Sequence, residues 1–210
     1  MVLQAMSNSK TDFTPWDQRY SADEPFYGSE PNDFLRSQTP RIVPGGKVLC
    51  LAEGYGRNAL FLARGGLHIT AVDGSQVGLS KLEKQATEKH LSVETVCADL
   101  ADFDMGIEKW DAIVSIWCHL PQPLRAGVHA RAVKALKHGG VFILEAYTPR
   151  QLQFKTGGPP VVEMLMTLEA LRTELNGLEI LHGVEIDRDI HEGRGHEGKS
   201  AVVQIVARRG

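Results

Sequence analysis

A glycine-rich turn, Gly54-Tyr55-Gly56, is the stretch of this sequence best suited to hold a ligand. A short apolar run, 48–52, precedes it, and apolar residues at helical spacing follow from Leu60, so the pattern predicts a strand, a tight turn and a helix. Glycines leave no side chain between the turn and a ligand. The helix, which begins near Arg57 or Asn58, directs free N–H groups into the same space, where they suit a carboxylate, a phosphate or a hydroxyl.

Asp73 follows a second apolar run, 68–72, and is predicted to lie at the tip of the second strand. An aspartate in this place accepts hydrogen bonds from both hydroxyls of a ribose. Gly74 and Ser75 come next, and Ser75 is a suitable N-cap for a helix. The first strand–helix–strand unit is therefore predicted to bind a nucleoside cofactor, with helix capping as the structural alternative for Asp73.

Two further features indicate which nucleoside the turn would accept. Glu53 places a negative charge beside the glycines, which disfavours a pyrophosphate and suits a cationic amine or a sulfonium. Asp99 and Leu100, after the third predicted strand, offer an acceptor for an adenine amine and an apolar surface for its ring. The glycine spacing also satisfies the dinucleotide pattern G-x-G-x-x-A, so NAD(P) stays an alternative.

Three histidines could assist an acceptor that must lose a proton: His119, His191 and His196. His119 follows the fourth predicted strand, and the other two lie at the last connection of the chain. That connection contains three glycines, which suit a mobile flap and equally an ordinary solvated hairpin. No third ligand stands at a suitable spacing from His191 and His196, so no metal site is predicted.

From Lys47 onward, strand-like and helix-like segments alternate, which is typical of a doubly wound α/β sheet. The expected strands cover residues 48–52, 68–72, 93–98, 110–117 and 141–147; after the helix that follows Gly56, the expected helices cover 75–90, 121–137 and 167–175. His138-Gly139-Gly140 is predicted to end the helix over 121–137. Two last strand-like segments, 178–190 and 201–207, lack room for a crossover helix between them, so they form a hairpin. We predict a Rossmann-like, mostly parallel seven-stranded sheet with a C-terminal antiparallel hairpin.

Residues 1–46 precede the first strand and are predicted to form an N-terminal arm, while 47–210 form a single domain. Residues 1–14 are polar and lack periodicity, so we expect them to be loose. Four aromatics follow in the arm: Trp16, Tyr20, Phe26 and Tyr27. They either pin the arm onto the core by their large buried area or form a lid over the site.

The composition restricts the partners and the compartment. A net charge of −3 over 210 residues and the lack of a basic stripe argue against nucleic acid as the partner. Three cysteines without a C-x-x-C pair fit a reducing cytoplasm. No apolar run approaches the roughly 18 residues of a membrane span, so we expect a cytoplasmic protein without a membrane partner.

Four motifs carry a resemblance to a known family: residues 48–58, Asp73-Gly74-Ser75, Ala98-Asp99-Leu100 and Trp110-Asp111. They resemble the motifs of class I S-adenosylmethionine-dependent methyltransferases, from Lys47 to the C-terminus. The Gly-Arg-Asn turn, the Trp-Asp-Gln-Arg-Tyr arm and the final hairpin further resemble the tellurite-resistance and thiopurine-methyltransferase-like branch, whose members methylate small soft nucleophiles. Glu53 and Tyr55 depart from the small residues that many members carry there.

The resemblance implies roles for individual residues. S-adenosylmethionine would be bound by residues of the turn and of the strand tips: Glu53, Gly54, Tyr55, Gly56, Asn58, Asp73, Gly74, Ser75, Asp99, Leu100 and Cys118. Cys118 and His119 would lie near the sulfonium. By analogy with the tellurite-resistance group, His191 would act with Arg194 or Lys199 as its cationic partner.

Methyl transfer needs an aligned nucleophile and exclusion of water, because the donor is already activated. A thiol, selenol or oxyanion such as tellurite can arrive ionised, so a dedicated base is dispensable. The leading interpretation is a methyltransferase that acts, as a monomer or a homodimer, on a small molecule held by the arm, Tyr147 and the loop 154–160. The alternatives are a non-catalytic binder of S-adenosylmethionine or a related nucleoside, and an NAD(P)-dependent oxidoreductase. An NAD(P)-dependent oxidoreductase would need a proton donor such as a Tyr with a Lys four residues later, and no Tyr of this sequence has that partner.

Overall fold

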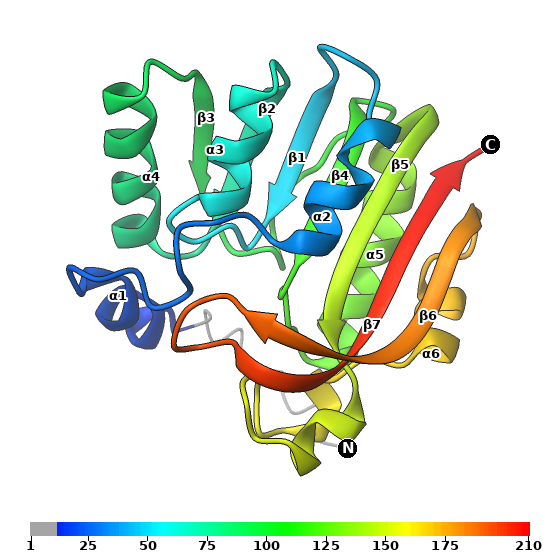
Figure 1. Cartoon of the computed structure of the whole chain (residues 1–210). Coiled ribbons are helices and arrows are strands. Elements are labelled where there is room, and N and C mark those ends of the chain that lie inside the picture. Colours follow the sequence, from blue (N-terminus) through cyan, green and yellow to red (C-terminus); the bar gives the residue numbers. More distant parts are fainter. Residues whose placement is uncertain (1–11) are drawn as a thin grey trace, which may run out of the picture.

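A seven-stranded sheet with the order β3-β2-β1-β4-β5-β7-β6 forms the centre of the computed structural model, which describes residues 12–210 (Figure 1). The strands are β1 (Lys47–Leu51), β2 (His68–Asp73), β3 (Val93–Cys97), β4 (Trp110–Ile116), β5 (Leu136–Tyr147), β6 (Leu178–His191) and β7 (Glu197–Arg209). The first five are parallel, whereas β7 runs antiparallel to both β5 and β6. The predicted Rossmann-like α/β sheet with a C-terminal antiparallel hairpin is confirmed.

Helices cover both faces of the sheet. They are α1 (Thr14–Ser21), α2 (Asp33–Gln38), α3 (Arg57–Arg64), α4 (Gln76–Glu88), α5 (Gln122–Ala135) and α6 (Leu168–Glu174), with short 3-10 turns at Thr39–Arg41, Pro149–Gln153 and Val162–Met164. Strand β1 explains the two layers, because alternate side chains of a strand point to opposite faces. Val48 and Cys50 pack with α2, α3 and α4, while Leu49 and Leu51 pack with α5 and α6.

The boundary between α5 and β5 differs from the prediction. The helix ends at Ala135, and β5 begins at Leu136, whose partner in β4 is Trp110. His138-Gly139-Gly140 therefore lies within the strand, at the register shift in the β4–β5 pairing, and does not end the helix. The two glycines indicate an irregular backbone at this point of the chain. The irregularity lies in a strand and not at a helix end, because Leu136 already pairs with β4.

The β6–β7 hairpin is longer than predicted and curves beneath the carboxyl ends of the parallel strands toward α1 (Figure 1). Its turn, 192–196, contacts the segment after α1: the Gly195 N–H donates to the Phe26 carbonyl over 3.0 Å. A Cβ on Gly193 would lie 2.3 Å from the Gly28 nitrogen. The glycines therefore permit a close approach of two backbones, and the turn is packed against the chain.

Residues 12–46, called the arm below, contain α1, α2 and the 3-10 turn before β1. Asn32 caps α2 by accepting a hydrogen bond from the Leu35 N–H over 2.9 Å. The α1 helix packs on α4. Most of the segment expected to be loose, 1–14, lies outside the described residues.

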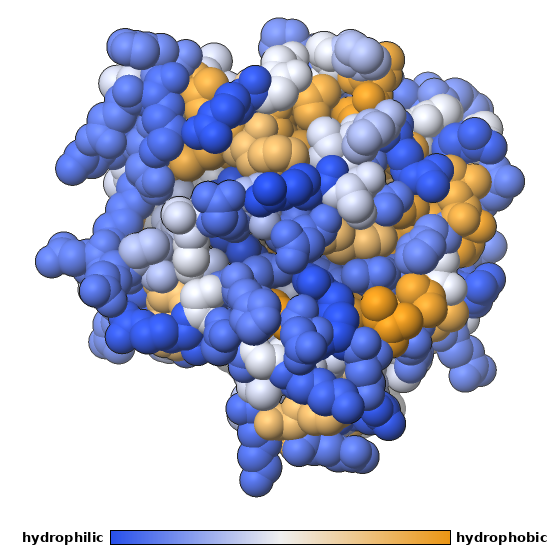
Figure 2. All heavy atoms as spheres, viewed as in Figure 1, coloured by the Kyte–Doolittle hydropathy of each residue, from blue (hydrophilic) through white to orange (hydrophobic). Residues whose placement is uncertain are grey.

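The surface shown in Figure 2 is mostly hydrophilic, with apolar side chains in separate patches. Within residues 12–210, none of the helices has the length and the apolar composition that crossing a bilayer requires.

Candidate active site

The sheet reverses its order between β1 and β4, and ligands of open α/β sheets bind at the carboxyl ends of the strands at such a point. Both strand tips carry a non-glycine residue in the left-handed region: Ala52 after β1, with φ of 50°, and Trp117 after β4, with φ of 56°. Such conformations are costly and concentrate at functional sites. The backbone therefore marks this edge as the candidate site.

The two glycines of the turn serve different purposes. Gly56 has φ of 89°, and a Cβ there would come within 2.2 Å of the Leu82 side chain of α4, so this glycine lets α3 and α4 pack. Gly54 has φ of 61°, and a Cβ there would lie 2.7 Å from the Tyr20 hydroxyl of the arm. Gly54 is therefore the glycine whose main chain faces the space under the arm.

Asp73 binds the glycine turn to the tip of β2. Its Oδ2 accepts from the Gly54 N–H and its Oδ1 from the Ser75 N–H, each over 2.8 Å. Ser75 caps α4 as predicted, through a 3.1 Å hydrogen bond from the Gly78 N–H to its Oγ. Burial raises the pKa of Asp73, and the two amide donors oppose that shift. Each carboxylate oxygen has a second lone pair, so Asp73 can accept from a ligand as well.

Three other side chains that were predicted to bind the cofactor form hydrogen bonds within the protein. The Glu53 carboxylate accepts from the Ala59 N–H over 2.8 Å and so caps α3; burial raises its pKa to about 7. Asn58 Oδ1 accepts from the Asn32 N–H over 2.9 Å. The Tyr55 hydroxyl donates to the Gly28 carbonyl over 3.0 Å and accepts from the Tyr27 N–H over 2.7 Å. These contacts hold the turn and the arm together.

The predicted adenine end lies at the tips of β2 and β3. Leu100 is buried in the core cluster beneath α5. Asp99 Oδ1 accepts from the Ala101 N–H over 2.9 Å. A Cβ on Gly74 would overlap the Phe13 ring, 2.0 Å from its nearest atom. The arm thus covers Gly74 with Phe13 and Gly54 with Tyr20.

Cys118 and His119 lie at the tip of β4, where the sequence predicted them. Burial raises the pKa of the Cys118 thiol to about 12, so the thiol is neutral at pH 7. His119 Nδ1 lies 3.0 Å from the Met164 carbonyl, which can only accept, so this nitrogen carries the proton. Its Nε2 accepts from the Tyr147 N–H over 3.4 Å, and burial lowers the pKa of His119 to about 4. Both ring nitrogens of His119 therefore brace the backbone.

Five rings stack beside that tip and are called the ring cluster: Tyr27, Trp117, His119, Tyr147 and His196. Trp117 lies 4.5 Å from Tyr147 and 4.8 Å from His196, measured between ring centroids. His196 Nδ1 lies 2.7 Å from the Tyr147 hydroxyl. Burial raises the pKa of Tyr147 and lowers that of His196 well below its ordinary value, so both are neutral.

His191 and Arg194 do not reach the ring cluster. His191 is 71% exposed and pairs over 2.7 Å with Glu197, which raises the pKa of the imidazole. Arg194 is 66% exposed and lies 3.6 Å from Glu24, and Lys199 lies 3.9 Å from Asp187. In this hairpin, alternation turns His191 outward, and the structure brings His196 inward in its place.

A buried group of charges lies between the glycine turn and the ring cluster, and sequence reasoning missed it. This charge network consists of Asn32, Arg57, Glu145, Arg188 and Glu192. Arg57 pairs with Glu192 over 2.5 Å, and Arg188 pairs with Glu145 over 2.9 Å. The available signal was Glu145, a carboxylate in the middle of an apolar strand, because a buried charge requires partners.

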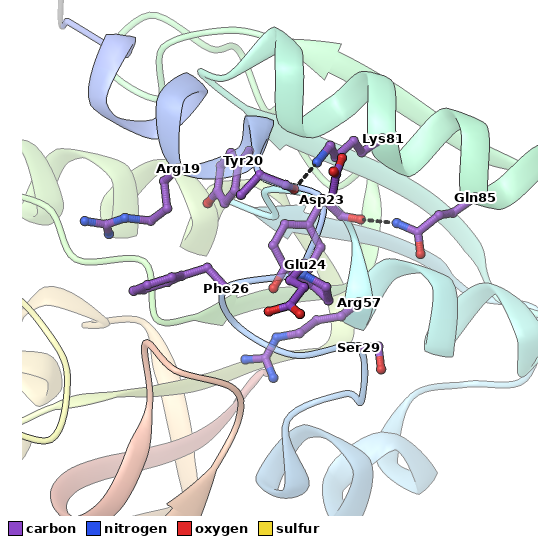
Figure 3. A pocket seen from close by; sticks show the side chains of 12 residues that line it. Arg19, Tyr20, Asp23, Glu24, Phe26, Ser29, Arg57, Lys81 and Gln85 are labelled. Carbon is purple, nitrogen blue, oxygen red and sulfur yellow. Dashed lines mark hydrogen bonds between the residues drawn. The ribbon is translucent and has the colours of Figure 1, made fainter.

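A cavity of about 150 Å³ lies between the arm, the glycine turn and α4 (Figure 3). Two hydrogen bonds close it from α4: Lys81 donates to the Ala22 carbonyl over 2.6 Å, and Gln85 donates to the Tyr55 carbonyl over 3.3 Å. Arg57 crosses the view toward the β6–β7 hairpin. The arm is thus fastened to α4 on the outer side of the glycine turn.

Comparison with known proteins points to one class of enzyme. Residues 48–140 match the family model described as methyltransferase domain. An uncharacterized methyltransferase, YbaJ of Bacillus subtilis strain 168, is 30% identical over 115 residues, which cover 54% of this chain and 45% of that relative. The aligned part thus spans less than half the length of the curated relative.

Solved structures share the fold. A protein from a study of the conversion of a disulfide bond into a thioacetal group during echinomycin biosynthesis superposes with a TM-score of 0.75 at 17% identity, covering 93% of this chain and 91% of that one. TehB from Haemophilus influenzae superposes with a TM-score of 0.68 at 22% identity, covering 85% and 62%. A SAM-dependent methyltransferase from Methanosarcina mazei also gives 0.68, at 16% identity, covering 86% and 98%. Residues 48–140 are therefore similar to a methyltransferase domain, and the fold of the chain is shared with S-adenosylmethionine-dependent methyltransferases.

Proposed function

We propose that this protein is an S-adenosylmethionine-dependent methyltransferase that transfers a methyl group to a small-molecule acceptor. The observation that carries the proposal is the glycine turn at the switch point, which Asp73 fixes through the Gly54 N–H. The match to a methyltransferase domain covers the same residues. Asp73 and the turn supply what a nucleoside with a charged amino-acid tail requires: a hydroxyl acceptor and exposed main chain.

The residues present fit this cofactor. Gly54 and Gly74 have no side chain on the side that faces the arm, and the nearest atoms that cover them there belong to the Tyr20 and Phe13 rings. A ligand would therefore lie between the arm and the two strand tips, with Asp73 on its ribose and Leu100 and Asp99 on its adenine side. The bound cofactor supplies a methyl group already activated on a sulfonium, so the chain has only to align the acceptor and exclude water.

We assign the acceptor to the ring cluster, on the Cys118 side of the switch point. The Tyr147 hydroxyl and His196 Nδ1 share a 2.7 Å hydrogen bond whose direction depends on the tautomer of the imidazole. Burial lowers the pKa of His196 well below its ordinary value, and both ring nitrogens of His119 contact the backbone, so neither histidine is a strong base. An acceptor that arrives ionised, such as a thiolate or a chalcogen oxyanion, suits a site without a strong base.

The arm is proposed to cover the bound cofactor, as a lid formed by residues 1–46 on the domain 47–210. The contacts of Phe13, Asp17 and Tyr20 with Gly74, Ser75 and Gly54 support this role. We further propose that the protein acts in the cytoplasm, as a monomer or a homodimer. Its proposed partner is the small-molecule acceptor, and nucleic acid, a membrane and a metal ion are not proposed as partners.

Calorimetric titration tests the cofactor assignment. The wild type is expected to bind S-adenosylmethionine and S-adenosylhomocysteine and not NAD(P)H, and Asp73→Ala is expected to lose the binding. Transfer of labelled methyl to a panel of thiols, selenite and tellurite then tests the acceptor class. Binding of NAD(P)H alone would overturn the proposal, and cofactor binding without transfer to any acceptor would favour a non-catalytic binder.

A further inference from the structure

Glu192 is a buried carboxylate at the start of the hairpin turn, and four side chains donate to it. The donors are Arg57 Nη2 at 2.5 Å, Trp117 Nε1 at 2.8 Å, Asn32 Nδ2 at 2.8 Å and Arg188 Nη2 at 3.2 Å. The residue is only 6% exposed. These donors come from the arm, α3, the tip of β4 and β6, so one carboxylate joins four separate parts of the chain.

The same residue organises the turn that carries His196. The Glu192 N–H donates to the His196 carbonyl over 2.9 Å, and the His196 N–H donates to the Gly193 carbonyl over 3.1 Å. The backbone of Glu192 thus begins a short turn that ends at His196, and its carboxylate binds the Trp117 indole. Glu192 therefore contacts both residues of the Trp117–His196 stack, the first through its ring and the second through its backbone.

Arg57 extends this connection to the glycine turn. It follows Gly56 directly, and its Nη1 donates to the Glu30 carbonyl over 3.0 Å, so its guanidinium has little freedom. A buried ion pair contributes little net stability compared with a well-packed apolar pair, because both charges lose their hydration. We therefore explain the buried Arg57–Glu192 pair by the relative positions of the segments that it joins, and not by a gain in stability.

We propose that Glu192 is the positioning residue of the acceptor pocket: it holds Trp117 and His196 in a fixed place relative to the glycine turn, through Arg57. The assignment of these rings to an acceptor rests on the proposed function. The positioning itself rests only on the contacts of Glu192, so the two can be tested separately.

The test compares Glu192→Gln with Glu197→Gln, a matched control in the same hairpin whose carboxylate is exposed and pairs with His191. The histidine ring signals are followed by NMR during a pH titration, with His196→Gln to assign the signal. In the wild type and in Glu197→Gln, His196 should stay neutral well below pH 6.5, because burial and the positive charges of Arg57 and Arg19 lower its pKa. In Glu192→Gln, the pKa of His196 should rise toward 6.5.

The direction of this change separates positioning from charge. Removal of a nearby carboxylate can only lower the pKa of a histidine through its charge, so a rise reports that the ring has moved into water. The signals of His129, a buried residue of α5 outside the ring cluster, should not change in the folded variant. With a known acceptor, its KM should rise about 10- to 100-fold in Glu192→Gln, as expected for a displaced reactant, while the Kd of S-adenosylhomocysteine changes far less.

An unchanged His196 titration in folded Glu192→Gln would overturn the positioning role. If that variant does not fold, Arg57→Lys loosens the same contact from its other end and should raise the pKa of His196 in the same direction. Titration of the wild type with S-adenosylhomocysteine tests the proposed function separately. An absence of binding would refute that function, and the NMR result would still decide whether Glu192 positions the rings.

Discussion

The two sides of the switch point are built from different parts of the chain. On the side proposed for the cofactor, main-chain groups make most of the contacts: the Gly54 and Ser75 amides bind Asp73, and glycines face the arm. On the side proposed for the acceptor, side chains bind side chains, through the charge network and the ring cluster. This site therefore combines a backbone-built half, which substitutions elsewhere change little, with a side-chain-built half, which single substitutions can reshape.

The largest effect is expected from breaking the side-chain-built half. Glu145→Ala removes a fully buried carboxylate that accepts from Arg188, Gln204 and Asn32. The free energy of unfolding should fall by about 3–5 kcal/mol, because Arg188 loses its main buried partner. Urea denaturation measures this change. Glu179→Ala, which removes the exposed partner of Arg208, is the control, and an equal loss in both variants would contradict the account.

A pair of substitutions should separate the two halves in binding. Asp73→Asn should weaken S-adenosylhomocysteine binding by about 10- to 100-fold, since hydrogen bonds to a charged group contribute about 1.5–3 kcal/mol. His196→Gln should leave that affinity unchanged and raise the KM of the acceptor. Calorimetry and steady-state kinetics give the two numbers, and a similar loss of cofactor affinity in both variants would remove the division.

A pH-dependent effect is expected from the cap of α3. Burial raises the pKa of Glu53 to about 7 in the folded protein, above its ordinary 4.5. The unfolded state therefore releases this proton first, and the contribution of Glu53 is fully present below pH 4.5 and is lost as the pH rises to about 7. Glu53→Gln keeps an acceptor for the Ala59 N–H, so its stability relative to the wild type should increase between pH 5 and pH 8. Denaturation midpoints at four pH values measure the difference, and a constant difference would refute this prediction.

The smallest effect concerns the arm. Asp17→Ala removes the 2.5 Å hydrogen bond from the Ser75 hydroxyl to the α1 helix. If the arm covers the cofactor, S-adenosylhomocysteine should dissociate several-fold faster, as expected for the loss of about 1 kcal/mol. Stopped-flow displacement measures the rate. Slower dissociation or tighter binding would indicate that the arm competes with the cofactor.

The division into a backbone-built half and a side-chain-built half also explains which features could be predicted from the sequence. The glycine turn, Asp73 at the tip of β2 and Ser75 at the start of α4 are local patterns, and the structure has each of these elements in the expected place. Periodicity and the short last connection were sufficient for the sheet and the hairpin. The roles of the predicted cofactor residues stay predictions.

Long-range side-chain contacts could not be predicted. Arg57 and Glu192 are 135 positions apart, and Asn32 and Glu145 are 113 apart, so no local pattern connects them. Within the hairpin, the register decides which histidine faces inward, and sequence reasoning favoured His191 where the structure turns His196 toward Trp117. The boundary of β5 also depended on its pairing with Trp110.

The central claim is that the cofactor binds to the backbone-built side of the switch point. Hydrogen exchange of the full chain, with and without S-adenosylhomocysteine, tests it most directly. The account predicts slower exchange in peptides that cover 52–58 and 73–78. Protection confined to other parts of the chain would contradict it. One such part is the groove at the amino-terminal ends of the parallel strands, which includes His68 and Glu94.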